Sequence, residues 1–408
     1  MITPYRKMKA LIWFTLLWSL TDSAAVTKSQ AKVNYDGFKV LRIANTADVA
    51  LKSKINKLSA HVLTCGEGPE LDVAVAPENI EAFNALAIDN TVIDEDLGSS
   101  LAAEGPFAPY ADHQQFVRDL QAAFPSNSEV INSGTSVQGR SILGLHIFGS
   151  GTKGTKPAIL FHGTVHAREW IATMTAEYMA YQLLTNYNSD TTVKAIVDKF
   201  DFYILPIVNP DGFSYTQTND RLWRKNRQTV SGNTCVGRDI NRNWPYKWEL
   251  TNGASTDPCD ETYKGQAAGD APENKGLVTL VSQLRASQGI RLYIDFHSYG
   301  QYILWPFGYD CNAVSPKSSA LTSLGRGAQS AIAAAGYNTQ YTIGPSCSTL
   351  YATTGDSVDY IDAVGNATYA YTIELRDTGR SGFVLPANQI QPTVTETWAG
   401  VKYMLGRA

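Results

Sequence analysis

The sequence predicts an α/β protein whose catalytic-sized part has a mixed, mostly parallel sheet with helices on both faces, preceded by a small α+β open sandwich. The chain has 408 residues, of which 44% are hydrophobic and 18% charged, so it can bury a large core. Short runs of β-branched and aromatic residues alternate with longer segments of helical spacing. An abrupt change in charge near the N-terminus marks a separate unit there.

The first 25 residues are typical of an export signal. Basic residues up to Lys9 precede an apolar run from 10 to 20, and small residues end at Ala25. An uncleaved membrane anchor is the alternative, but this run has eleven residues, whereas a span needs about eighteen. We therefore expect a signal peptide at 1–25 and a secreted, extracellular protein that is not attached to a membrane.

The next segment divides by charge. Residues 26–57 hold seven Lys or Arg and two Asp, whereas residues 58–117 hold no Lys or Arg and eleven Asp or Glu. Alternating strand-like runs at 38–43 and 71–76 are each followed by helical spacing, at about 46–60 and 77–87, which gives a β-α-β-α order. The stretch from 97 to 106 is rich in Gly, Ser and Ala and is interpreted as a linker.

From about residue 110 the chain shows one continuous α/β pattern, so we assign 106–408 to a single domain. Its strands and helices are expected to form a sheet covered on both faces. The expected strands are 157–162, 202–208, 290–297 and 369–375, and the expected helices are 170–186, 272–287 and 318–335. The formal net charge of −4 and the absence of a Lys/Arg-rich run argue against nucleic acid as a partner.

Polar side chains follow two of these strands. His166 and Glu169 are three residues apart just before a helix, and His297 ends another strand. Open α/β sheets place their sites at such strand ends, and two imidazoles with a carboxylate suit catalytic zinc. A His-x-x-Glu pair is weak evidence alone because it often arises by chance.

Further motifs resemble the zinc metallocarboxypeptidases of the pancreatic carboxypeptidase A type. The resemblance extends from about residue 110 to the C-terminus, with the motifs in the family's order. The motifs are His166-Ala-Arg-Glu169-Trp170, Asn209-Pro-Asp-Gly-Phe213, Arg221-Leu-Trp-Arg224, Asp239-Ile-Asn241-Arg242-Asn243-Trp244, Phe296-His297-Ser298-Tyr299, Thr372-Ile-Glu374-Leu-Arg-Asp-Thr-Gly and Thr397-Trp398.

The resemblance implies one Zn²⁺ per catalytic domain, with His166, Glu169 and His297 as its ligands. It implies that Glu374 is the general base that acts on the water activated by zinc, and a salt-bridged strand-end carboxylate is the alternative role for this residue. Asp239 matches the carboxylate that orients His166, with a loop cap as its alternative.

The family's arginines imply the remaining catalytic and binding roles. Arg224 matches the residue that stabilises the oxyanion, and Asn241 with Arg242 matches the pair that binds the terminal carboxylate of the substrate. Such a carboxylate grip makes the enzyme an exopeptidase, since an internal peptide bond offers no free carboxylate. Arg168 is expected near the scissile region, and Tyr351 matches the mobile phenol that closes over the bound residue.

Two positions bear on specificity. Val358 matches the base of the specificity pocket and favours aromatic and aliphatic C-terminal residues. Asp356 stands where strictly apolar-preferring relatives have glycine, so we expect additional, weaker acceptance of Lys and Arg. The alternative is that Asp356 points into solvent or caps the next turn.

Export permits disulfides, and the chain has five cysteines. Cys65 lies far from the other four in sequence and in a segment of different character, so we take it as the unpaired one. The resemblance implies one pair between Cys235 and Cys259, and a second, found in only some members, between Cys311 and Cys347.

The resemblance also makes residues 26–105 an inhibitory prosegment that covers the active site. Pancreatic members are activated by cleavage at a basic residue, but here no Lys or Arg lies between Lys57 and Arg118. We expect activation by a subtilisin-like protease instead, an arrangement that fits microbial, particularly fungal, members.

The resulting prediction is a monomeric, secreted zymogen of a zinc carboxypeptidase that acts on peptide and protein C-termini. A non-catalytic binding relative would lose a zinc ligand or the base, and all four residues are present. A zinc hydrolase for small amino-acid amides would not keep Arg224, Asn241, Arg242 and Tyr351 together.

Overall fold

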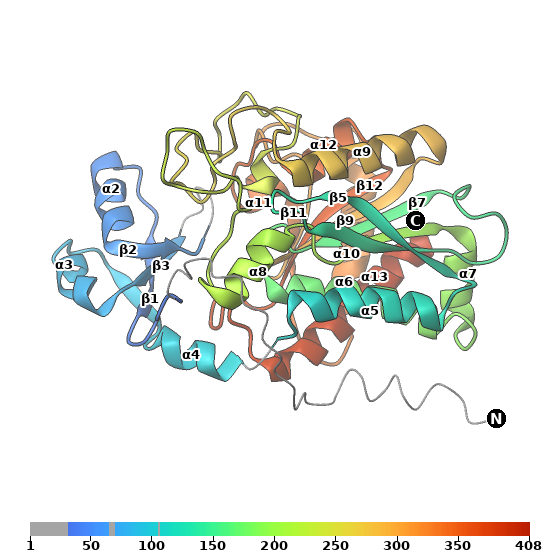
Figure 1. The fold of residues 1–408 in the computed structure, drawn as a ribbon, viewed down its shortest axis with the longest axis horizontal. Coiled ribbons are helices and arrows are strands. Elements are labelled where there is room, and N and C mark those ends of the chain that lie inside the picture. Colours follow the sequence, from blue (N-terminus) through green and yellow to red (C-terminus); the bar gives the residue numbers. More distant parts are fainter. Residues whose placement is uncertain (1–31, 65–69, 105–106) are drawn as a thin grey trace. The chain divides into compact units, whose positions relative to one another are not determined.

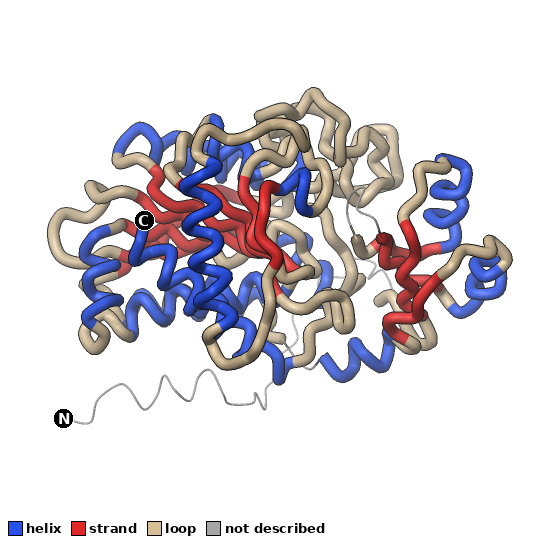
Figure 2. Tube along the Cα trace, turned by 180° about the vertical axis from the view of Figure 1, so that it is seen from behind, coloured by secondary structure: helices blue, strands red, loops and turns tan. Residues whose placement is uncertain are grey.

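The central sheet of the catalytic part contains eight strands, in the order β11-β10-β12-β9-β7-β8-β6-β5 (Figures 1 and 2). The computed structural model describes residues 32–64, 70–104 and 107–408, so the predicted signal peptide at 1–25 and Cys65 lie outside the described residues. The strands are β5 (Ser128–Thr135), β6 (Ser141–Ile147), β7 (Ala158–Gly163), β8 (Asp201–Leu205), β9 (Ile290–Ser298), β10 (Tyr302–Trp305), β11 (Thr342–Pro345) and β12 (Tyr369–Leu375).

The sheet is mixed, as predicted. β7 runs parallel to β8 and β9, β9 runs parallel to β12, and β10 runs parallel to β11. β10 is antiparallel to β12, and β5, β6 and β8 are joined by antiparallel pairings. Because β7, β9 and β12 are parallel neighbours, their carboxyl ends meet at one edge of the sheet, where open α/β folds place their sites.

Helices cover both faces of the sheet, which confirms the predicted fold class (Figure 1). α9 (Pro272–Ser287) and α12 (Ser357–Ala363) pack on one face. The other described helices of this part are α5 (Tyr110–Ala123), α6 (Trp170–Thr185), α7 (Thr191–Lys199), α8 (Pro210–Thr218), α10 (Ser318–Ala333), α11 (Ser346–Thr349) and α13 (Ile390–Arg407). Among these, α6, α10 and α13 cover the opposite face.

The two faces have separate cores, because successive strand residues point to opposite sides. On the α9 side, Leu160 and Tyr293 of the sheet pack with Leu277 and Val281 of α9. On the other side, the rings of Phe161 and Phe296 meet edge to face, 5.8 Å between centroids. Strands buried on both faces appear in the sequence as continuous apolar runs, which is why β7, β8, β9 and β12 could be predicted.

The N-terminal unit is a four-stranded antiparallel sheet in the order β2-β3-β1-β4. The described elements are β1 (Lys39–Ala44), α2 (Val49–Leu58), β2 (Ser59–Val62), β3 (Glu70–Val75), a 3-10 turn (Pro77–Asn79), α3 (Ile80–Asn84), β4 (Asn90–Asp94) and α4 (Leu97–Glu104). The β-α-β-α order predicted from the sequence was incomplete, because β2 and β4 are short edge strands with mostly polar or exposed residues and no clear alternation.

The predicted linker at 97–106 was wrong over most of its length, because residues 97–104 form α4. Asp96 accepts hydrogen bonds from the Ser99 side chain (2.6 Å) and backbone, which caps the first turn. Leu97 and Glu104 are buried at the two ends of the helix. These tertiary contacts outweigh the weak helix propensity of Gly98 and the two serines.

Within the described part of the chain, none of the helices has the length and apolar content that a membrane span requires.

Candidate active site

Three buried donor groups converge at the carboxyl edge of the sheet. His166 and Glu169 lie in the connection between β7 and α6, and His297 lies near the end of β9. His166 Nδ1 is 2.7 Å from Glu169 Oε1, His297 Nδ1 is 3.0 Å from Glu169 Oε2, and the two Nδ1 atoms are 3.1 Å apart. One ligand atom from each residue lies within 4.8 Å of the others. Two imidazoles and one carboxylate fit the donor set of a catalytic zinc ion and leave room for a fourth ligand.

The charges within this cluster reinforce one another. Burial raises the pKa of Glu169, but His166 and His297 lower it to about 2, so the carboxylate is ionised. Burial lowers the pKa of His297, but Asp295 and Glu169 raise it well above its usual value. The site therefore concentrates negative charge around two imidazoles, which is the electrostatic setting that favours a divalent cation.

Asp239 lies behind His166 and joins it to Arg224. Its Oδ1 is 3.2 Å from His166 Nε2, and its Oδ2 accepts hydrogen bonds from Arg224 Nη2 (2.8 Å) and Nε (3.1 Å). Burial raises the pKa of Asp239, but Arg224 and His166 hold it well below the usual value. Asp239 Oδ1 also accepts from Asn241 N at 2.8 Å, so both alternatives considered for it, orienting carboxylate and loop cap, describe its contacts.

Glu374 stands beside the donor cluster, because β12 pairs with β9 so that Glu374 is opposite His297. The side chain is half-buried. Burial raises the pKa of Glu374 to about 8; nearby Glu169 adds to this shift, while His297 and Arg224 oppose it.

The expected substrate-binding residues lie around this cluster. Arg242 is buried and donates from Nε to Gly253 O (2.5 Å) and from Nη1 to Asn241 O (2.9 Å). Asn241 Oδ1 accepts a hydrogen bond from Ser357 N (2.8 Å), which ties it to the start of α12. These bonds fix the plane of the guanidinium and the orientation of the amide.

Arg168 has no exposed surface in the full chain. Its guanidinium lies 4.2 Å from the Phe383 ring, and it donates to Leu222 O and, from Nη2, to Leu63 O of the N-terminal unit, each at 3.3 Å. An arginine expected near the scissile region is thus in contact with the segment expected to be a prosegment.

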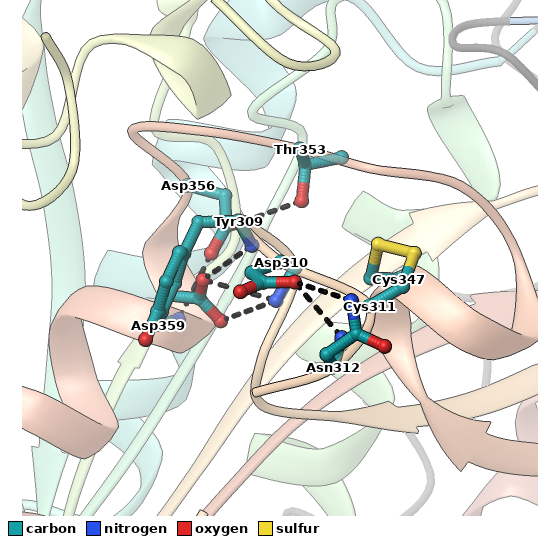
Figure 3. The surroundings of a disulfide bond; sticks show 9 residues. Tyr309, Asp310, Cys311, Asn312, Cys347, Thr353, Asp356 and Asp359 are labelled. Carbon is teal, nitrogen blue, oxygen red and sulfur yellow. Dashed lines mark hydrogen bonds between the residues drawn. A yellow bond between two sulfur atoms is a disulfide. The ribbon is translucent and has the colours of Figure 1, made fainter. Parts of the chain in front are cut away.

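Asp356 and Val358, the two positions expected to bear on specificity, lie at the start of α12, and Figure 3 shows Asp356 there. Asp356 is buried and caps the helix, accepting from Asp359 N (2.9 Å), and its second oxygen accepts from Thr353 Oγ1 (2.5 Å). The capping alternative for Asp356 is therefore present in the structure. Val358 is 2% exposed and belongs to the core on the α9 face. Tyr351 is half-buried, in the loop before α12.

Both expected disulfides are formed, Cys235–Cys259 and Cys311–Cys347. The second, shown in Figure 3, links cysteines 36 positions apart and joins the segment after β10 to α11. Tyr351 follows α11 in the sequence. The second disulfide therefore limits the freedom of the chain that carries this phenol.

Two buried residues near the donor cluster were not identified from the sequence. Asp295 lies two positions before His297 on β9, and His162 pairs with it from β7. Residues two apart on a strand share a face, so Asp295-Phe-His297 was a signal that could have been used.

Fold and site together define a zinc-dependent peptidase of the carboxypeptidase type, and comparison with known proteins identifies the family. The zinc carboxypeptidase family profile matches residues 113–400. The metallocarboxypeptidase A of Arthroderma otae is 42% identical over 98% of this chain and 99% of its own length. A metallocarboxypeptidase A-like protein of Trichophyton verrucosum is 41% identical over 97% of this chain and 99% of its own length.

A solved structure agrees with these sequence matches. The carboxypeptidase A of Helicoverpa armigera gives a TM-score of 0.80 at 26% identity, covering 92% of this chain and 98% of that one. The chain belongs to the zinc carboxypeptidase family and is a metallocarboxypeptidase, a hydrolase of the carboxypeptidase A type.

Proposed function

We propose that this protein is a secreted zymogen whose mature form removes the C-terminal residue of peptides and proteins, with one zinc ion held by His166, Glu169 and His297. The observation that carries this proposal is the convergence of the three buried donor groups at the edge of the sheet. When bound, zinc acts as a Lewis acid on the scissile carbonyl and makes water nucleophilic at neutral pH.

Glu374 is the general base of this proposal. Its carboxylate accepts the proton of the attacking water and passes it to the leaving amine. Its position opposite His297 places it next to the metal ligands. A cation at the neighbouring site favours the ionised carboxylate and so counteracts the effect of burial on its pKa.

Arg224 stabilises the oxyanion that develops on the carbonyl oxygen. Its guanidinium keeps its charge, and Asp239 fixes it through two hydrogen bonds. The same carboxylate contacts His166, so one buried residue aligns the metal ligand with the oxyanion donor.

Asn241 and Arg242 bind the terminal carboxylate of the substrate, and Tyr351 closes over the bound residue. The side-chain oxygen Oδ1 of Asn241 accepts a hydrogen bond from Ser357 N. The side-chain NH₂ group of Asn241 is therefore the donor that can bind the carboxylate of a substrate. A charge-assisted hydrogen bond from Arg242 to the terminal carboxylate of the substrate restricts the enzyme to the C-terminal ends of chains.

We further propose that the pocket prefers aromatic and aliphatic side chains, with weaker acceptance of Lys and Arg. Val358 at the start of α12 supports the apolar preference. The buried carboxylate of Asp356 supports the weaker basic acceptance. Both of its oxygens already accept hydrogen bonds, so a basic side chain shares this carboxylate with Thr353 and the helix terminus.

Residues 26–105 act as an inhibitory prosegment in this proposal. Leu63 O accepts from Arg168, and Asp72 accepts from Tyr299 (2.7 Å), two residues after His297. A subtilisin-like protease is expected to cut within residues 97–109, and because residues 97–104 form α4 we expect the cut after Glu104. Trypsin is expected to produce no mature N-terminus between 58 and 117. N-terminal sequencing distinguishes these outcomes, and tryptic activation near Ala108 would contradict the proposal.

Zinc content and kinetics of the mature enzyme test the catalytic assignment. We expect one zinc per chain, loss of activity with a chelator, recovery with added zinc, and loss of the metal in His297→Ala. Glu374→Gln should keep zinc and the KM for a blocked dipeptide but lower kcat by several orders of magnitude. Full activity of metal-free enzyme, or a Glu374→Gln effect mainly on KM, would refute the assignment.

A further inference from the structure

A second buried carboxylate faces the imidazole of His297 from the side opposite Glu169. His297 Nδ1 lies 3.0 Å from Glu169 Oε2, whereas its Nε2 lies 2.9 Å from Asp295 Oδ2. His166 has the same arrangement, with Glu169 near Nδ1 and Asp239 near Nε2. We propose that Asp295 is a positioning residue that holds His297 with Nδ1 toward the metal, an inference that rests on the zinc site proposed above.

Strand geometry makes this contact. Asp295 and His297 are two residues apart on β9 and therefore point to the same face of the sheet. His162 on β7 lies opposite Asp295 in the parallel pairing, so it belongs to the same face. The carboxylate is thus placed between two imidazoles by the backbone of two central strands.

The surroundings of Asp295 keep its carboxylate in place. Its Oδ2 accepts a hydrogen bond from Ser357 Oγ (2.7 Å). Its Oδ1 lies 3.0 Å from His162 Nδ1, a close contact without regular hydrogen-bond geometry among the described residues. The phenol of Tyr293 lies 2.6 Å from His162 Nε2. With the phenol as the donor in this bond, the proton of a neutral His162 ring resides on Nδ1 and faces Asp295.

The position of the proton on a metal-ligating imidazole explains why a carboxylate near His297 Nε2 would matter. A ring that binds a metal through Nδ1 keeps its proton on Nε2. That N–H of His297 is fully buried, and Asp295 is the acceptor that faces it. In the described part of the chain the contact lacks regular hydrogen-bond geometry, and His297 Nε2 has no other partner. Without the Asp295 carboxylate no negative charge would face this buried N–H at 2.9 Å, which disfavours the metal-bound form of the ring.

Metal affinity of the full, uncleaved chain tests the role of Asp295 without relying on activity. Asp295→Asn keeps the volume and removes the charge, and Asp89→Asn is the control, since Asp89 is exposed on the N-terminal unit. We expect the Zn²⁺ dissociation constant, measured by chelator competition, to rise about 10- to 100-fold in Asp295→Asn and to stay unchanged in Asp89→Asn. The visible spectrum of the Co²⁺-loaded protein should shift in Asp295→Asn alone.

The possible outcomes separate the two proposals. Failure of the wild-type chain to bind Zn²⁺ would refute the zinc site itself. A folded Asp295→Asn chain with wild-type affinity and an unchanged Co²⁺ spectrum would refute the role of Asp295 while leaving the zinc site intact. If circular dichroism shows that Asp295→Asn does not fold, Ser357→Ala decides: a several-fold weaker affinity supports the role of Asp295, and wild-type affinity overturns it.

Discussion

Individual buried carboxylates hold neighbouring side chains in position, because each carboxylate contacts groups from different elements. Asp239 contacts His166 and Arg224, and Asp295 contacts His297 and Ser357. A buried charge is stable only when it is paired, so each of these residues fixes its partners while being stabilised by them. The same principle applies far from the active site, where its consequences can be measured separately.

The buried pair of His113 on α5 and Glu177 on α6 should make stability depend on pH. The two side chains are 2.8 Å apart. Burial lowers the pKa of His113, but Glu177 raises it above its usual value of 6.5. The folded chain therefore binds more protons than the unfolded chain near neutral pH. The stabilising contribution of the His113–Glu177 pair is fully present below pH of about 6.5. It is lost as the pH rises through the pKa of His113 in the folded chain.

Glu177→Gln should therefore destabilise the protein more in acid than in alkali. We expect the unfolding free energy to fall by about 3 kcal/mol at pH 5.5, as for a broken buried pair, and by less at pH 8.5. Thermal midpoints at both pH values, with zinc held in excess, measure the difference, and Glu81→Gln on the exposed side of α3 is the control. An equal loss at both pH values would contradict the assigned pairing.

At the scale of elements, the sequence predicted the strands that are buried on both faces of the sheet. It did not predict the strands and helices whose formation depends on tertiary contacts. β9 is a largely apolar run with His297 next to its last residue, and both features are visible in the sequence. β4 is a largely exposed edge strand that depends on pairing with β1, so its residues carry no clear pattern. The helix from 97 to 104 depends on its cap at Asp96 and on a buried ion pair of Glu104, neither of which follows from local composition.

The same distinction holds for the candidate site. The residues proposed to carry the chemistry, His166, Glu169, His297 and Glu374, stand in motifs, so their roles could be hypothesised from the sequence. Their supporting contacts involve distant parts of the chain: Ser357 reaches Asp295 across 62 positions. Such partners become identifiable only when the topology brings β9 and α12 together.

Substitutions of Asp356, at the start of α12, should distinguish its helix-capping role from a role in substrate recognition. Asp356→Asn keeps an N-cap acceptor of similar quality but removes the charge. We expect kcat/KM for substrates ending in Arg to fall about tenfold, and the value for Phe to stay unchanged, because a charge-assisted contact is lost. Blocked dipeptides with either C-terminal residue provide the measurement.

Thermal stability supplies the control for this variant. Asp356→Asn should keep the wild-type midpoint, whereas Asp356→Ala should lose about 1 kcal/mol with its cap. Equal changes in kcat/KM for both substrates, or no hydrolysis of Arg substrates by the wild-type enzyme, would leave Asp356 with its capping role only.

At the scale of the whole molecule, the N-terminal unit is joined to the catalytic part by specific buried polar contacts. Val33–Ala408 form one compact unit. Tyr35 donates to Asp220 at 2.5 Å, and Arg221 forms a two-pronged ion pair with Glu104 at the end of α4, with Nε 2.8 Å from Oε2. Arg221 also donates to Arg168 O at 2.8 Å and stacks on Trp170. The end of α4 is thus tied through Arg221 to Arg168 and Trp170, the neighbours of Glu169 in the sequence.

This ion pair should hold the proposed inhibitory segment, residues 26–105, in place before cleavage. In Glu104→Ala, Arg221 remains buried without its carboxylate partner. This loss should weaken the docking of the N-terminal unit onto the catalytic part by about 3 kcal/mol, which is more than a hundredfold in the docking equilibrium. We therefore expect the uncleaved Glu104→Ala chain to hydrolyse a blocked dipeptide at least tenfold faster than the uncleaved wild-type chain. Glu95→Ala is the matched control, because Glu95 is exposed and pairs with Lys39 inside the N-terminal unit.

Cleavage provides an internal control for the same variant. A cut on the C-terminal side of α4 removes Glu104, so the mature enzymes from the wild-type and variant chains are identical and must have equal activity. Any difference between the uncleaved chains then reports on docking alone. Equal activities of the uncleaved wild-type and Glu104→Ala chains would contradict a role for the end of α4 in inhibition. The contacts of Leu63 and Asp72 with Arg168 and Tyr299 would then be the next to test.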